Sequence, residues 1–113
     1  HKSKLILLIS TLFASFHCFS GGATEQGTID VLYVHASWTE ASIPSIDSTQ
    51  NNPDTCVSTS YFAIHPTDTN YEALHATLLA AQLSGKKVSF WVSGCGGQNG
   101  QYPHIQSVFL HSN

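Results

Sequence analysis

Hydrophobic and polar residues alternate along the last third of the chain. The sequence VSFWVS separates Val88, Phe90 and Val92 by serine and tryptophan positions. A period of two places successive side chains on opposite faces of a strand, so this segment predicts a strand with one apolar face. Residues 104–112 predict another strand, and the glycine-rich residues 93–101 between the two predict a flexible turn.

Immediately before that strand, hydrophobic residues recur with the period of a helix. They are Tyr71, Leu74, Leu78, Leu79 and Ala81. This spacing gathers them on one side of an α-helix. Thr69, with Glu72 three residues later, predicts an N-terminal capping box, and Gly85 predicts the C-terminal cap. We therefore expect one amphipathic helix between Thr69 and Gly85.

The first half of the chain carries weaker patterns. Residues 27–37 are rich in valine, isoleucine, leucine and tyrosine and predict a buried strand. Residues 38–54 are mostly polar and predict a long surface connection, with a short extra element near residues 41–43. Residues 55–65 predict a further strand. The order strand, strand, helix, strand, strand predicts an α+β fold: a small, mostly antiparallel sheet or OB-like barrel with one helix packed across it.

The beginning of the chain has the pattern of a secretory signal peptide. Lys2 and Lys4 precede an apolar run, and small residues follow it. We expect a leader over residues 1–23, with cleavage after Ser20 or after Ala23 both compatible with the pattern. A single OB-like domain over residues 24–113 would remain, in a secreted or periplasmic protein. A domain of about 90 residues has a marginal core, which a disulfide or an oligomer interface would reinforce.

The charge balance excludes one class of partner. The whole chain has four basic and seven acidic residues. Loss of the leader would remove Lys2 and Lys4 and leave Lys86 and Lys87 as the basic residues. A nucleic acid or an anionic membrane surface is not expected as a partner, because phosphate binding needs a basic face.

Two cysteines, Cys56 and Cys95, follow the expected leader. In an exported chain two cysteines most simply form a disulfide, here closing a loop of about 40 residues that would add about 4 kcal/mol of stability. Reactive thiols and metal ligands are the alternatives.

Catalytic and cofactor motifs are not recognised. The histidines after the expected leader are His35, His65, His75, His104 and His111. Their spacing matches no compact metal-ligand motif, although a site assembled from distant positions stays open. Serines are frequent, but no G-x-S-x-G elbow is present, and Asp30 and Asp68 are candidates for an acidic pair only by elimination. We expect no metal, no cofactor and no enzymatic activity.

Aromatic and amide side chains are the best candidates for ligand binding. If Val88, Phe90 and Val92 face the core, Trp91 faces outward, unless the connection after Trp38 covers it. Trp38 and Tyr102 share this ambiguity. The polar candidates on or beside the predicted turn are Gln98, Asn99 and His104. Amides beside aromatic rings suit neutral glycans, though they also suit any polar loop.

The second half of the chain also resembles a known family. The pattern consists of Tyr71, Leu74, Leu78, Ala81, residues 84–86, Val88 and residues 102–103. It is similar to the B subunits of pentameric bacterial A–B toxins, most of all the subtilase cytotoxin and pertussis-like branch. The resemblance implies a five-stranded OB-like barrel, an internal disulfide, a ring of five subunits, an enzymatic partner subunit and cell-surface glycan ligands.

The resemblance does not extend to the first half of the chain, and the segment that holds the sialic-acid contacts of that branch has no counterpart. We therefore transfer no binding residue from the family. Two functions remain: an exported, oligomeric, glycan-binding module, and an exported protein-binding accessory factor or inhibitor within an envelope complex.

Overall fold

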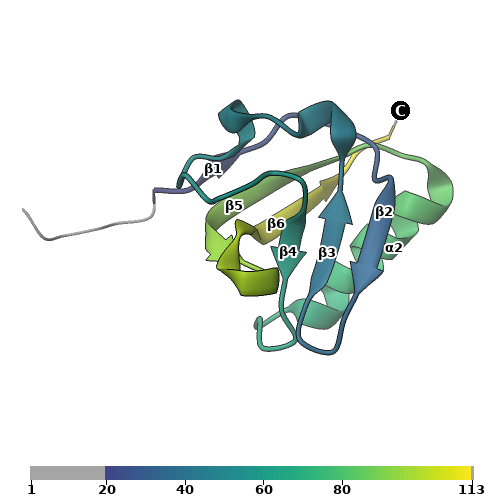
Figure 1. Ribbon diagram of the computed structural model, residues 1–113. Coiled ribbons are helices and arrows are strands. Elements are labelled where there is room, and N and C mark those ends of the chain that lie inside the picture. Colours follow the sequence, from purple (N-terminus) through teal and green to yellow (C-terminus); the bar gives the residue numbers. More distant parts are fainter. Residues whose placement is uncertain (1–19, 113) are drawn as a thin grey trace, which may run out of the picture.

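One helix packs on a sheet of six strands in the computed structural model, which describes residues 20–112 (Figure 1). The strands are β1 (Gly22–Ala23), β2 (Val31–Val34), β3 (Thr39–Ser42), β4 (Phe62–Ile64), β5 (Val88–Gly96) and β6 (Tyr102–Leu110). The helix is α2 (Tyr71–Ser84), and 3-10 turns cover Pro44–Ile46, Thr49–Asn51 and Gln98–Gly100. The expected leader lies outside the described residues except for residues 20–23.

The sheet is open and mostly antiparallel. Its strand order is β1-β5-β6-β4-β3-β2, so β1 and β2 form the two edges. The pairing of β4 with β6 is parallel, and the other pairings are antiparallel. The expected α+β class is confirmed. Of the two forms that the sequence allowed, the structure has the open sheet and not the closed OB-like barrel.

The core lies between α2 and one face of the sheet. Its fully buried members include Phe62, Ile64, Leu78, Ala81, Val88, Phe90, Val92 and Ile105. The predicted apolar face of residues 88–92 is therefore confirmed. Leu79 belongs to the other side of the helix, where it is 40% exposed, so its assignment to the apolar stripe was wrong.

The ends of α2 differ in how well the sequence predicted them. Gly85 adopts a left-handed conformation with φ 71°, as expected for a C-terminal cap. At the other end Asn70 is the N-cap residue and makes no side-chain capping bond, so the expected Thr69–Glu72 capping box is not formed. The helix begins one residue later than that box requires.

The region from Trp38 to Asp54 is less exposed than expected. It contributes β3, which lies inside the sheet between β2 and β4, and the buried residues Ile43 and Ile46. The interpretation as a surface connection was therefore wrong, although a short element had been expected near residues 41–43. β2 and β4 are also shorter than the strands predicted over residues 27–37 and 55–65.

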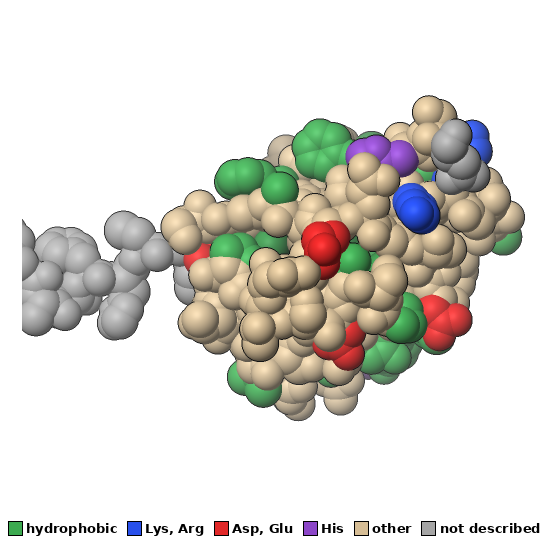
Figure 2. Space-filling model, turned by 90° about the horizontal axis from the view of Figure 1, so that it is seen from above, with side chains coloured by type: hydrophobic (Ala, Val, Ile, Leu, Met, Phe, Trp, Pro, Cys, Tyr) green, Lys and Arg blue, Asp and Glu red, His purple; other side chains and the backbone are tan. Residues whose placement is uncertain are grey.

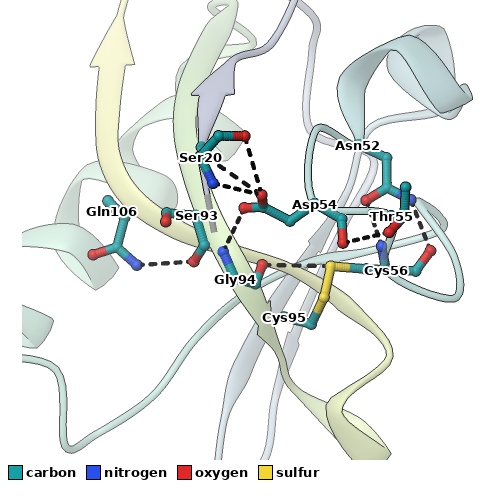
Figure 3. The surroundings of a disulfide bond; sticks show 10 residues. Ser20, Asn52, Asp54, Thr55, Cys56, Ser93, Gly94, Cys95 and Gln106 are labelled. Carbon is teal, nitrogen blue, oxygen red and sulfur yellow. Dashed lines mark hydrogen bonds between the residues drawn. A yellow bond between two sulfur atoms is a disulfide. The ribbon is translucent and has the colours of Figure 1, made fainter. Parts of the chain in front are cut away.

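The expected disulfide joins Cys56 to Cys95, at a separation of 39 residues. Asp54 lies beside it: its Oδ1 accepts the N–H groups of Ser20 at 2.9 Å and Gly21 at 3.4 Å, and its Oδ2 accepts that of Gly94 at 2.8 Å (Figure 3). The disulfide and Asp54 together connect the 52–56 turn to β5. No helix within residues 20–112 is long and apolar enough to cross a membrane.

Candidate functional site

The face of the sheet opposite α2 carries most of the polar and aromatic side chains. Residues alternate across a strand, so the neighbours of the core residues point to this second face. In β2, β3 and β4 these neighbours are Tyr33, Glu40 and Ala63, and their register is Tyr33 opposite Glu40 and Glu40 opposite Ala63. Figure 1 shows α2 behind the sheet and the Gln98–Gly100 turn in front of it.

The turn that follows β5 is held on this face by two side chains. The Gly97 N–H donates to His65 Nε2 at 2.9 Å, and the Gln98 N–H donates to Glu40 Oε2 at 2.7 Å. A Cβ atom on Gly96 would overlap the His65 ring, and one on Gly97 would overlap the Glu40 carboxylate. These two glycines of the predicted 93–101 turn are therefore required for this close packing.

Glu40 is a buried carboxylate with only one of its oxygens paired. The residue is fully buried, and Oε1 has no hydrogen-bond partner within the described part of the chain. Burial raises the pKa of Glu40, against the lowering effects of the Gln98 N–H and of His35. Burial also raises the pKa of Tyr102, and the nearby Glu40 and Tyr61 add to that rise.

Four partly exposed aromatic side chains, Tyr33, Trp38, Tyr61 and Tyr102, form a continuous row, which we call the aromatic row. Tyr33 contacts Trp38 and Tyr61, with ring centroids 6.1 and 6.3 Å apart. Tyr61 in turn contacts Tyr102 edge to face at 5.5 Å. Such separations are within the range of favourable aromatic pairs. At one end the exposed His35 stacks on Trp38 at 3.8 Å.

His65, Asp68 and His104 form a second group, the His–Asp–His cluster. His104 Nε2 lies 3.0 Å from both carboxylate oxygens of Asp68 and 3.3 Å from His65 Nδ1. Asp68 Oδ2 also accepts the backbone N–H of His65 at 2.8 Å. Burial lowers the pKa of His65 and His104 lowers it further, while Asp68 raises it. These three residues could hold a metal ion.

The structure brings some of the predicted ligand-binding residues together. Trp38 and Tyr102 belong to the aromatic row, and the exposed Gln98 and Asn99 lie on the turn that precedes Tyr102. His104 belongs instead to the His–Asp–His cluster. These positions locate the candidates, and their role in binding stays a prediction.

Trp91 is separate from these groups. It is 44% exposed, which answers the question of its direction that the sequence left open. It pairs with Ser107 while Phe109, 52% exposed, pairs with Ser89, so both aromatic side chains emerge from the β5–β6 ribbon on the face away from the core. Seen from above, the surface has several hydrophobic patches, one of them beside a histidine (Figure 2).

Sequence reasoning did not propose a binding role for four members of the two groups: Tyr33, Tyr61, His65 and Asp68. Tyr33 and Tyr61 had been placed inside long predicted strands with no assigned direction. Asp68 had been considered as a member of an acidic pair, and its contact with His104 depends on the pairing of β4 with β6. The alternation of side chains along β2 and along β4 would have indicated only that Tyr33 and Ala63 lie on the face of the sheet away from the core.

Comparison of the chain with protein-family models, with curated proteins and with solved structures found no significant match.

Proposed function

We propose that this protein is a non-enzymatic binding module, secreted or periplasmic, that recognises neutral carbohydrate through the aromatic row. The row itself carries this proposal. Its members come from β2, the β2–β3 turn, the segment before β4, and β6, yet their rings are in continuous contact and partly exposed. Partly exposed aromatic rings present an apolar surface with polar edges, which suits the apolar faces and hydroxyl groups of a sugar.

The polar groups around the row favour an uncharged ligand. Gln98 and Asn99 offer exposed amide groups on the adjoining turn, and amides both donate and accept hydrogen bonds. The basic residues among the described ones are Lys86 and Lys87, which follow α2. A strongly acidic glycan would find no cationic partner in the row, and Glu40 beneath it would repel an anion.

The disulfide is compatible with the exported location that the signal-like pattern predicts, because such bonds persist in oxidising compartments. The expectation of no enzymatic activity rests on the sequence, where no catalytic motif was recognised. The likeness to toxin B subunits adds a homo-oligomeric ring and an enzymatic partner subunit to the proposal, but the open sheet does not provide the barrel that this likeness implied.

A glycan array with the purified exported protein tests the proposal, followed by calorimetric titration of any sugar that binds. We expect Tyr61→Ala and Tyr102→Ala to weaken binding at least tenfold, because each removes a ring from the middle or end of the row. Trp91→Ala is the matched control, since it removes an exposed ring outside the row. Absence of binding to every glycan, or a loss of binding in the control alone, would reject the row as a carbohydrate site.

A second candidate function is supported by Trp91 and Phe109. Two neighbouring, half-exposed aromatic side chains on one ribbon are typical of a protein interface. They would serve either a homo-oligomer or an accessory factor that binds another exported protein. The mass in solution of the wild type and of Trp91→Ser separates these cases: a wild-type oligomer that dissociates in the variant supports the first, and co-purification of one protein partner from the source cells supports the second.

A further inference from the structure

The His–Asp–His cluster brings three side-chain donor atoms to one point from two separate parts of the chain. One ligand-type atom from each of His65, Asp68 and His104 lies within 4.8 Å of the other two. The pairing of Ala63 with His104 places His104 beside the end of β4, and Pro66 and Asp68 follow in the turn that leaves this strand. The side chains are between 17% and 24% exposed, so the cluster is enclosed yet reachable from solvent.

The separations between these atoms match a tetrahedral metal centre. Ligands about 2.0 to 2.1 Å from a zinc ion, at tetrahedral angles, lie about 3.3 Å from one another. Here His65 Nδ1 and His104 Nε2 are 3.3 Å apart, and His104 Nε2 is 3.0 Å from Asp68 Oδ1. The third separation, from His65 Nδ1 to Asp68 Oδ1, is 4.0 Å. This third separation is longer than the tetrahedral value, so metal binding requires the Asp68 carboxylate to move toward His65.

When both histidines are neutral, their ring N–H groups cannot satisfy all of the contacts among His65, His104 and Asp68. Because the Gly97 N–H donates to His65 Nε2, the neutral His65 ring carries its proton on Nδ1. If His104 Nε2 also carries a proton, two N–H groups face each other; if it does not, its lone pair faces the Asp68 carboxylate. Either arrangement leaves one unfavourable contact, which a cation between the three atoms would remove.

We propose that His65 Nδ1, His104 Nε2 and one oxygen of Asp68 bind a divalent transition metal ion of the zinc class. Two imidazoles and one carboxylate are a common ligand set for zinc, whereas calcium and magnesium prefer oxygen ligands. The three side chains are partly exposed, so solvent water can supply the fourth ligand. This site departs from the sequence-based expectation that the protein holds no metal.

Metal binding has a structural consequence for the turn after β5. When His65 Nδ1 coordinates the metal, the ring proton moves to Nε2, so the ring neither gains nor loses a proton overall. The Nε2–H group then faces the Gly97 N–H, and the hydrogen bond between them is lost. In the metal-bound form the 97–101 turn therefore shifts away from His65. The hydrogen bond from the Gln98 N–H to Glu40 shifts with the turn.

Titration of the metal-free exported protein with Co²⁺, followed by competition with Zn²⁺, tests the site. We expect the intense visible absorption bands of tetrahedral Co²⁺, which Zn²⁺ displaces with one ion per chain. Asp68→Asn and His104→Gln should each lower the affinity at least tenfold, because each removes one ligand. His111→Gln is the matched control, since His111 bonds to Ser89 outside the cluster. Absence of these bands, or equal weakening in the control, would overturn the proposal.

The coupling to the turn is tested separately by amide NMR of the wild type with and without Zn²⁺. We expect the Gly97 and Gln98 amide signals to shift and their hydrogen exchange to quicken on metal binding. Asp68→Asn retains an oxygen that can accept the His65 N–H, so it serves as the folded, weakly binding reference. Tight zinc binding with unchanged Gly97 and Gln98 amides would overturn the predicted shift of the turn.

Discussion

The Asp54 carboxylate accepts the backbone N–H of Gly94 at 2.8 Å, immediately before the disulfide-bonded Cys95. The same carboxylate accepts the N–H groups of Ser20 and Gly21, so one side chain connects the β1 edge, the 52–56 turn and β5 (Figure 3). The Gly94 N–H is the main cause that lowers the pKa of Asp54; partial desolvation opposes it, and the Ser20 and Gly21 contacts add to the lowering.

This lowered pKa predicts an acid-dependent loss of stability. The contribution of Asp54 is fully present above its unfolded pKa of 3.8 and is lost as the pH falls through its lower folded value. Asp54→Asn should therefore be less stable than the wild type near neutral pH and lose less stability on acidification. Urea unfolding over a series of pH values measures this. Asp30→Asn is the control, because Asp30 is exposed, and an equal flattening in the control would contradict the assignment to Asp54.

Gly97 is expected to be the least replaceable residue of the turn after β5. Its φ of 73° and ψ of −154° belong to a region that glycine alone adopts readily, and a Cβ atom would overlap the Glu40 carboxylate. Gly97→Ala should lower the free energy of unfolding by about 2 to 4 kcal/mol, from backbone strain and overpacking together. Gly100→Ala tests the backbone effect alone, since Gly100 has a positive φ of 64° and open space around its Cα.

The Gly100→Ala change should cost about 1 kcal/mol. Chemical unfolding of the two alanine variants beside the wild type provides the comparison. Equal losses in the two variants would show that the Glu40 contact adds nothing to the cost at Gly97.

The elements that the sequence predicted well are those in which the spacing of the apolar residues matches the spacing of the buried positions. α2 and β5 have apolar residues at helical and strand periods, and Gly85 ends the helix. β3 was anticipated only as a short element near residues 41–43 within a surface connection, because its sequence TEAS contains one apolar residue, although Thr39, Glu40 and Ala41 are all fully buried. Burial of Glu40 depends on a turn that comes far later in the chain, and no local pattern reports such a contact.

The candidate sites show the same contrast between residues that a local pattern indicates and contacts that only the fold creates. Trp38 and Tyr102 were chosen as aromatic residues in polar segments, which composition alone can indicate. The contact of Tyr61 with both Tyr33 and Tyr102 requires the strand order of the sheet. The His–Asp–His cluster requires the parallel pairing of β4 with β6, which joins segments on either side of α2. Neither relationship has a signature in residue spacing.

Glu40 gives a second pH-dependent prediction, of opposite sign. Its pKa is raised by burial, so its contribution to stability is present below the unfolded value of 4.5 and is lost as the pH rises through the folded value. Glu40→Gln retains an oxygen for the Gln98 N–H and cannot ionise. Its stability relative to the wild type should therefore improve as the pH rises above 4.5, until Glu40 ionises in the folded protein.

Thermal or urea unfolding of the Glu40→Gln variant and the wild type over that pH range tests this sign. Glu72→Gln is the control, because Glu72 is exposed in the first turn of α2. A difference between Glu40→Gln and the wild type that does not depend on pH would mean that Glu40 is not the group that titrates.

The contacts of β1 predict which of the two expected cleavage positions, after Ser20 or after Ala23, would leave the more stable chain. Gly22 and Ala23 pair with Val92 and Trp91 on β5, and the Gly21 N–H lies 3.4 Å from Asp54 Oδ1. A chain that begins at Gly21 keeps β1 and places its charged amino group beside the Asp54 carboxylate. A chain that begins at Thr24 loses both. We expect the longer chain to be more stable by about 1 to 3 kcal/mol, the value of a few backbone hydrogen bonds.

Urea unfolding of two purified chains, beginning at Gly21 and at Thr24, measures the difference. A third chain that begins at Gly21 and carries Asp54→Asn measures the contribution of the whole Asp54 carboxylate, which accepts the Gly94 N–H as well as lying beside the amino group. Sequencing the amino terminus of the protein purified from its source then decides between the two cleavage positions that the sequence allowed. Because a leader cut after Ala23 would leave the outer edge of β5 without β1, we expect the exported chain to begin at Gly21. A start at Thr24, with stability equal to that of the longer chain, would show that β1 is dispensable.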